Sequence, residues 1–184
     1  SLPYHTIHDY AVAYRSGETT PSAVCEHFLD AVIASDRGNH PLRAFIASYT
    51  NDVRAQAAAA TERLAKGEPL SWLDGVPVAV KDEIDMRPYP TTVGTQIFGK
   101  QSAKSDSAVV ARLRAAGALL LGKANMHEIG INPTGVNIHH GQARNPYHLE
   151  HDPGGSSSGP AAATAAGFCP VSIGADGGGS IRVP

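Results

Sequence analysis

The chain has 184 residues, of which 42% are hydrophobic and 17% are charged, and it carries a formal net charge of −2. This composition is typical of a globular chain and excludes a disordered or fibrous one. No run of lysine and arginine is present, so we expect no nucleic-acid binding through a basic patch and favour a small molecule as the partner.

The first seventy residues predict helices. Thr20 places a capping hydroxyl before Pro21, which suits the first position of a helix, and apolar residues then recur at helical spacing. A second helix is predicted over about residues 52–66, because its alanines favour a helix and Gly67 provides a left-handed stop. We therefore predict an N-terminal helical segment over residues 1–70.

From residue 71 onward, short apolar runs alternate with helical patterns. Two runs predict buried strands, with a helix between them that Ser105 caps and Gly117 ends. The strands are predicted over residues 76–80, 118–121 and 171–174, and a later helix over residues 160–166. Strands that alternate with helices predict an α/β layer fold with a largely parallel sheet, in which functional side chains gather just beyond the strand ends.

Two glycine-rich loops near the end of the chain each carry a serine. Ser156 lies in the loop 154–159 and Ser180 ends the loop 177–180, so the two serines are 24 positions apart. Glycine removes side chains from backbone that must approach another group closely, which leaves N–H donors exposed beside the serine hydroxyl. This arrangement suits attack on a carbonyl group.

A serine hydroxyl needs a base within hydrogen-bond reach to act as a nucleophile at neutral pH. Lys81 is the candidate, because it closes an apolar strand and burial disfavours the charged form of a lysine. Its pKa would have to fall from the reference value of about 10.4 by about 2 to 3 pH units. The alternative is an ordinary lysine paired with one of three acidic neighbours, Asp82, Glu83 and Asp85, and the local sequence leaves both interpretations open.

Five motifs together resemble the amidase signature family in their order and spacing. They are residues 75–82 (GVPVAVKD), 122–128 (GKANMHE), 144–146 (RNP), 154–159 (GGSSSG) and 174–184 (GADGGGSIRVP). The resemblance spans residues 74–184 and implies an α/β/α fold around a large mixed, mostly parallel sheet. It also implies that residues 71–184 are the N-terminal part of this core, in one domain that is incomplete at its C-terminus.

The same resemblance implies a serine-serine-lysine triad. Ser180 would be the nucleophile that forms the acyl-enzyme, Ser156 the relay serine, whose peptide bond is commonly cis, and Lys81 the base. The oxyanion would be bound by the backbone N–H groups of Gly177, Gly178, Gly179 and Ser180. Consecutive glycines agree with this role, because they can turn their amides inward without a side-chain clash.

Four further residues are expected to support the site rather than to react. Ser157 and Ser158 are near enough to contribute hydrogen bonds, and serines in glycine loops more often satisfy nearby backbone groups. Asp176 and Arg182 flank the nucleophile and, as in the family, are expected to hold its loop through an ion pair.

Histidines provide the main argument for a metal site. His139, His140, His148, His151 and Asp152 lie close together in the sequence. Their spacing matches no helical His-Glu-x-x-His site, and the two cysteines, Cys25 and Cys169, show no zinc-ligand spacing. We therefore expect no metal and no other cofactor, and we expect both cysteines to be buried free thiols.

The implied activity is hydrolysis of a small-molecule amide through an acyl-enzyme. Within the family, the alternative is the glutamine-hydrolysing subunit of a transfer-RNA amidotransferase, whose nucleophile loop typically reads TGGSIRQP. This chain has Gly177 and Val183 at the first and seventh of these places, which favours amide hydrolases, including the type that acts on fatty acid amides. Residues 90–92 and 123–128 favour the same type.

Two interpretations lie outside catalysis. A nucleotide-binding module is disfavoured, because neither glycine loop completes a phosphate-binding motif. An inactive fragment or interaction module is a stronger alternative, since family members are considerably longer and unpaired strand edges would need a missing C-terminal segment or a complementary chain. A homo-oligomer is also compatible with the sequence.

The sequence contains no sign of a membrane span. No stretch reaches the roughly 18 consecutive apolar residues that such a helix needs, and no signal segment opens the chain. The first residue is Ser1 rather than methionine, so a targeting segment removed upstream stays an alternative. A cytoplasmic location is therefore expected only by default.

Overall fold

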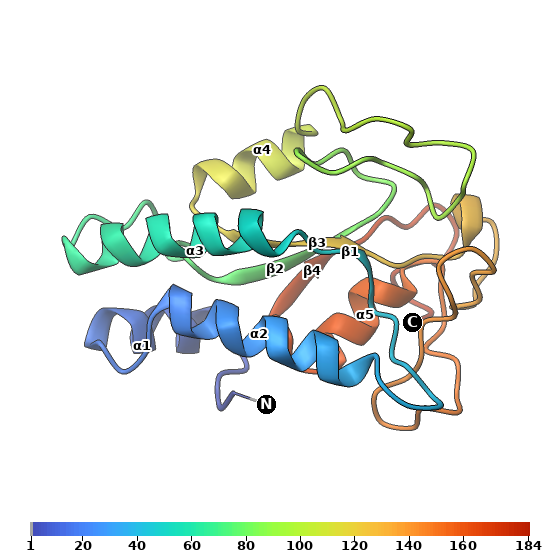
Figure 1. Ribbon diagram of the computed structural model, residues 1–184, viewed down its shortest axis with the longest axis horizontal. Helices are drawn as coiled ribbons and strands as arrows, with labels where there is room; N and C mark the ends of the chain where they lie inside the picture. The colour runs from blue at the N-terminus through green and yellow to red at the C-terminus, as the bar shows by residue number, and fades with distance from the viewer. Residues whose placement is uncertain (1) are drawn as a thin grey trace.

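A four-stranded mixed sheet lies at the centre of residues 2–184, the part of the chain that the computed structural model describes (Figure 1). Its strands are β1 (Phe45–Ala47), β2 (Pro77–Lys81), β3 (Leu119–Ala124) and β4 (Val171–Ile173), in the spatial order β1-β3-β2-β4. β2 pairs in parallel with β3 and β4, and β1 pairs antiparallel with β3. The prediction of an α/β fold with a mixed, mostly parallel sheet is confirmed.

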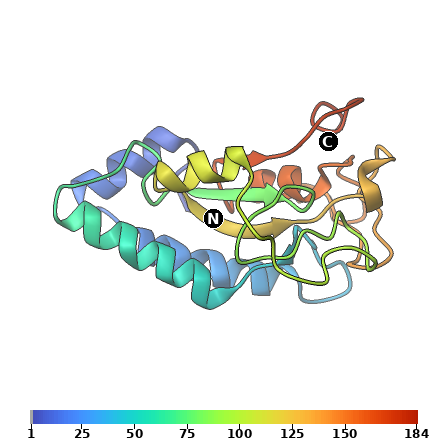
Figure 2. The same ribbon diagram turned by 90° about the horizontal axis from the view of Figure 1, so that it is seen from above.

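Helices cover both faces of this sheet. One face is covered by α2 (Pro21–Ser35), α3 (Thr50–Ala65) and α5 (Ser158–Ala165), and the other by α4 (Ala108–Ala115). Figure 2 shows α4 on the opposite side of β2 and β3 from α2 and α3. α1 (Ile7–Ser16) packs against α2 and the residue that precedes β2. The arrangement is the layered one that alternating strands and helices predict.

Each face of the sheet buries its own apolar cluster. On the α2 side, the ring of Phe28 lies 5.4 Å from that of Phe45 and 6.1 Å from that of Phe168, between ring centroids. On the α4 side, Val78 and Val80 of β2 pack in one buried cluster with residues of α4 and β3. Burying one such side chain contributes about 1.5–3 kcal/mol, so the clusters hold β2 between two packed layers.

Successive side chains of β2 point to opposite faces of the sheet, and this alternation positions the site. Ala79 belongs to the cluster on the α2 and α5 side, whereas Val78 and Val80 belong to the cluster on the α4 side. Lys81 therefore points to the α5 side and Asp82 to the α4 side. The two ionisable neighbours are separated by the strand itself.

The N-terminal helices follow the sequence prediction except at one strand. Thr20 Oγ1 accepts a hydrogen bond of 3.2 Å from the N–H of Ala23, and α2 begins at Pro21 as predicted. The prediction that the first seventy residues are helical was wrong at β1, which pairs with β3 through Phe45 and Ala47. Three residues carry too short a pattern to be recognised as a strand between two helices.

The start of α4 also differs from the prediction. Ser107, not Ser105, is the N-cap, because α4 begins at Ala108 and the Ser107 hydroxyl accepts from the N–H of Val110 at 3.4 Å. Gly117 adopts a positive φ of 85° just beyond the helix, at the predicted stop. The later helix, α5, begins two residues before its predicted start at 160.

The carboxyl ends of the three parallel strands lie at one edge of the sheet, and the loops that follow them meet there (Figure 1). A short 3-10 helix, η1 (Glu128–Gly130), lies in the loop after β3.

Cys25 and Cys169 are both buried and free, as predicted. None of the helices within residues 2–184 combines the length and the apolar character that crossing a membrane requires.

Candidate active site

Lys81 lies at the carboxyl end of β2, and its side chain is only 1% exposed. Its ammonium nitrogen donates to Ser156 Oγ at 2.9 Å and to the carbonyl of Ala175 at 3.3 Å, and lies 3.2 Å from Glu83 Oε1. Burial lowers the pKa of Lys81, and the nearby Glu83 carboxylate opposes this shift. Lys81 therefore contacts a serine of the glycine loop and also pairs with Glu83, one of its three acidic neighbours.

Asp82, the next residue, belongs to a separate buried pair. Its Oδ1 lies 3.4 Å from Lys123 Nζ, and both side chains are 1% exposed. Asp82 Oδ2 accepts from the hydroxyl of Thr92 and, at 2.9 Å, from the N–H of Gly94. Burial lowers the pKa of Lys123, while Asp82 raises it. This pair fixes the loop after β2 on the α4 side of the sheet.

Ser156 is buried beside Lys81 because two glycines let the loop before α5 pass close to other backbone. The Gly155–Ser156 peptide bond is cis. A Cβ atom at Gly155 would lie well inside the 3.0 Å that real Cβ atoms keep from other atoms, against the backbone of Thr134. The carbonyl of Ser156 accepts from the N–H of His127 at 3.2 Å, which ties the loop to the segment after β3.

Ser180 lies in the turn after β4 and is partly buried. Its carbonyl accepts from the N–H of Ser157 at 3.1 Å, so the two glycine loops are joined through their backbones. No hydrogen bond between the hydroxyls of Ser156 and Ser180 is present within residues 2–184. The structure therefore brings Lys81 and Ser156 into direct contact and places Ser180 on the adjoining loop.

Asp176 holds the Ser180 turn together. Its carboxylate accepts from the N–H groups of Gly179, at 2.6 Å, and Ile181, at 3.0 Å. It also forms the predicted ion pair with Arg182, with nitrogen–oxygen distances of 2.8 and 3.0 Å. These hydrogen bonds, that from Arg182 first, hold the pKa of Asp176 far below its usual value. Asp176 therefore stays charged over the whole neutral range.

Three of the four amides expected to bind an oxyanion are unengaged. The N–H of Gly179 is taken by Asp176 Oδ1. Within residues 2–184, the N–H groups of Gly177, Gly178 and Ser180 have no protein acceptor. A Cβ atom at Gly177 or Gly178 would meet nothing within 4 Å, so open space lies on the Cβ side of both residues.

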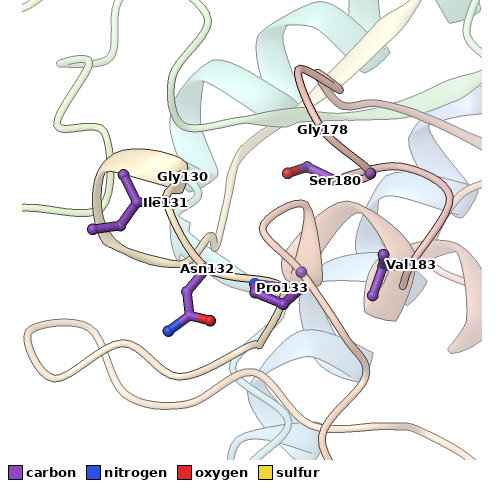
Figure 3. A pocket seen from close by; sticks show the side chains of 9 residues that line it. Gly130, Ile131, Asn132, Pro133, Gly178, Ser180 and Val183 are labelled. Atoms are coloured by element: carbon purple, nitrogen blue, oxygen red, sulfur yellow. The ribbon is translucent and has the colours of Figure 1, made fainter.

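A cavity of about 200 Å³ opens beside Ser180. The residues that line it come from three loops and are Gly130, Ile131, Asn132, Pro133, Gly155, Gly178, Gly179, Ser180 and Val183. Figure 3 shows the Ser180 hydroxyl directed into the space between its own turn and the segment that carries Gly130 and Ile131. Sequence reasoning missed the 130–133 segment, because its residues carry no reactive group and only the fold brings them to Ser180.

The two other loop serines differ from one another. Ser157 Oγ donates to the carbonyl of Ala175 at 3.3 Å, in line with the expectation that it satisfies nearby backbone. Ser158 is fully buried, and its hydroxyl has no hydrogen-bond partner within residues 2–184. The expected hydrogen bond from Ser158 to nearby backbone is therefore absent from the described part of the chain, and Ser158 is instead the first residue of α5.

The histidine cluster forms ordinary side-chain contacts. His139 Nε2 lies 2.8 Å from Glu128 Oε1, and the rings of His148 and His151 stack with centroids 4.1 Å apart. Asp152 accepts from the N–H of Gly154 at 2.6 Å and so holds the start of the serine loop. Within residues 2–184, no three side chains of His, Cys, Asp or Glu converge as metal ligands.

Comparisons with known proteins found a matching family and similar curated proteins. The family described as Amidase matches residues 24–184. The chain is 48% identical to a fatty acid amide hydrolase from Oryza sativa subsp. indica over 182 residues, 98% of this chain and 30% of that protein. It is 44% identical to a glutamyl-tRNA(Gln) amidotransferase subunit from Salinispora arenicola over 168 residues, 91% of this chain and 34% of that protein. The chain thus spans about a third of the length of these curated relatives.

A solved structure shows the same fold. The peptide amidase from Stenotrophomonas maltophilia matches with a TM-score of 0.90 and 33% sequence identity, over 97% of this chain and 37% of that one. The family match covers most of the chain and includes Lys81, Ser156 and Ser180. The chain therefore belongs to the Amidase family.

Proposed function

We propose that the protein containing this chain hydrolyses a carboxylic amide to an acid and an amine or ammonia. Ser180 is the nucleophile, Ser156 the relay and Lys81 the base. The observation that carries the proposal is the 2.9 Å hydrogen bond from Lys81 Nζ to Ser156 Oγ at a buried strand end. Membership of the Amidase family supports the reaction class.

The reaction runs in two halves. Neutral Lys81 takes the proton of Ser156, which takes the proton of Ser180, and Ser180 Oγ forms a bond to the amide carbon. The relay then returns a proton to the nitrogen, the carbon–nitrogen bond breaks, and the amine leaves. Water attacks the acyl-enzyme by the same proton path, which releases the acid and restores Ser180.

The amides of the Ser180 turn stabilise the negative oxygen of the tetrahedral intermediate. The unengaged N–H groups of Gly177, Gly178 and Ser180 supply these donors, whereas Gly179 donates to Asp176. Removing one donor of this kind costs about 3 to 4 kcal/mol of transition-state stabilisation in other hydrolases. Asp176 has a positioning role in this scheme, since it holds the turn from which the donors project.

The cavity favours an amide of an apolar acid over glutamine. Ile131 and Val183 line it and are 80% and 52% exposed, and no charged side chain lies among its lining residues within residues 2–184. A glutamine site would need a partner for the substrate's own charged groups. A relative named fatty acid amide hydrolase is the more similar of the two curated relatives, at 48% against 44% identity.

Hydrolysis of a substrate panel by the full-length protein tests the proposal. We expect release of amine or ammonia from long-chain acyl and aryl amides, little release from glutamine, and complete loss in Ser180→Ala. Glutamine as the preferred substrate would support the amidotransferase alternative. Turnover that survives in Ser180→Ala would contradict the assigned nucleophile.

A further inference from the structure

The nitrogen of Lys81 has three acceptors around it, and their number matters. They are Ser156 Oγ at 2.9 Å, Glu83 Oε1 at 3.2 Å and the carbonyl of Ala175 at 3.3 Å. A charged lysine has three N–H donors and no lone pair, so it can donate to all three. A neutral lysine has two N–H donors and one lone pair. Only the hydroxyl of Ser156 can donate a proton to that lone pair.

The geometry points to Glu83 as a positioning residue for the base, an inference that rests on the proposed function. Glu83 and the Ala175 carbonyl accept the two N–H groups of neutral Lys81, which leaves its lone pair directed at Ser156 Oγ. Neither acceptor can take the place of Ser156, because a carboxylate and a carbonyl have no proton to give. Glu83 thus selects the one orientation of Lys81 in which the relay works.

A second observation places the Glu83 carboxylate beside the reacting groups. Gly130 lines the cavity next to Ser180, and a Cβ atom there would lie 3.4 Å from Glu83 Oε2 and 3.3 Å from Ser156 Oγ. The absence of a side chain at Gly130 therefore leaves room for both groups. The Glu83 side chain is 25% exposed, so its carboxylate is less deeply buried than the Lys81 side chain, which is 1% exposed.

Glu83 is the acidic group nearest to Lys81 among those that face it. Asp176, in the segment after β4, also favours the charged lysine but is committed to Arg182 and to the amides of its own turn. α5 and β4, which pack beside β2, contain no titratable side chain. Lys123 of β3 lies on the other face of the sheet, paired with Asp82. Removing the charge of Glu83 should therefore alter Lys81 directly.

The direction in which the pKa of Lys81 changes in Glu83→Gln follows from its pairing with the Glu83 carboxylate. The base works only when neutral, so kcat/KM rises with pH through the pKa of Lys81. A negative neighbour raises that pKa, and its loss lowers it. In Glu83→Gln we expect the acid limb of kcat/KM to move to lower pH by about one to three pH units, the range typical of a close opposite charge. Glu83→Asp keeps the charge, and its limb should stay closer to that of the wild type.

The experiment is the pH profile of amide hydrolysis by the full-length protein and four variants. Glu62→Gln is the matched control, because it removes the same charge from an exposed ion pair between Glu62 of α3 and Lys66, which follows that helix, and should leave the acid limb in place. Lys81→Ala tests the role of Lys81 as the base separately from the role of Glu83. Activity retained in Lys81→Ala would refute the assignment of Lys81 as the base. If Lys81→Ala is inactive and the limb of Glu83→Gln does not move, the proposed function stands and the role of Glu83 is overturned.

Discussion

Replacing Gly155 by alanine adds a single methyl group where the backbone of two loops is in contact. The added Cβ would lie within 3.0 Å of the carbonyl oxygen, the carbonyl carbon and, at that limit, the nitrogen of Thr134. These are backbone atoms and cannot move aside as the end of a side chain does. The serine loop must therefore shift, and Ser156, which follows directly, shifts with it.

The size of the effect follows from this contact. Forcing an extra methyl group into packed structure destabilises a protein by about 1–3 kcal/mol. The hydrogen bond between Lys81 Nζ and Ser156 Oγ is 2.9 Å long, so a shift of Ser156 by about 1 Å would break it. Misplacing a reacting group by about 1 Å lowers the rate by about 10²-fold. In full-length Gly155→Ala we therefore expect kcat/KM to fall about 100-fold. The assay measures kcat/KM, and urea unfolding of the same variant measures its free energy of unfolding.

Gly178→Ala is the matched control for stability. A Cβ atom at Gly178 would meet nothing within 4 Å, so the free energy of unfolding should stay within about 0.5 kcal/mol of the wild type. Wild-type kcat/KM and wild-type stability in Gly155→Ala would refute the reasoning that close backbone contact sets the position of Ser156.

Two further predictions concern the supporting ion pairs. Asp176→Asn should slow turnover and make the free energy of unfolding less dependent on pH in acid. The pKa of Asp176 in the folded protein lies below its usual 3.8, so the wild type loses this stabilisation as pH falls below that value. Equal dependence of the free energy of unfolding on pH in the wild type and the variant would contradict this prediction. Lys123→Met should destabilise the protein by about 3–5 kcal/mol, because it leaves Asp82 buried without its cation, whereas Lys66→Met in an exposed pair should cost less than about 1 kcal/mol; equal losses in urea unfolding would contradict this.

The position of Lys81 at the end of a strand could be predicted from local sequence. Lys81 closes a run of buried β-branched and small residues, and this pattern alone indicates a strand whose last residue lies at the sheet edge. The cap at Thr20 and the left-handed turn at Gly117 were likewise predictable, since each depends on chemistry within a few residues.

What the sequence could not reveal depends on contacts between distant segments. Lys81 contacts both Glu83, two residues away in the sequence, and Ser156, which is distant in the sequence. Local sequence could therefore not decide whether Lys81 pairs with an acidic neighbour or contacts the serine loop. Ile131 carries no chemical signal and reaches the cavity only because the loop after β3 folds beside Ser180. β1 is too short to show a period, and the sequence did not indicate that Asp176 accepts from the Gly179 amide.

The central claim is that Lys81 activates Ser180 through Ser156, and labelling of Ser180 by a fluorophosphonate tests it most directly. The rate of labelling in full-length protein is measured against pH for the wild type and for Lys81→Ala. We predict that the rate falls by about 10²–10⁴-fold in Lys81→Ala, the usual contribution of a general base, and that its dependence on pH through the pKa of Lys81 disappears. Labelling of Lys81→Ala at the wild-type rate, with the same pH profile, would contradict the account.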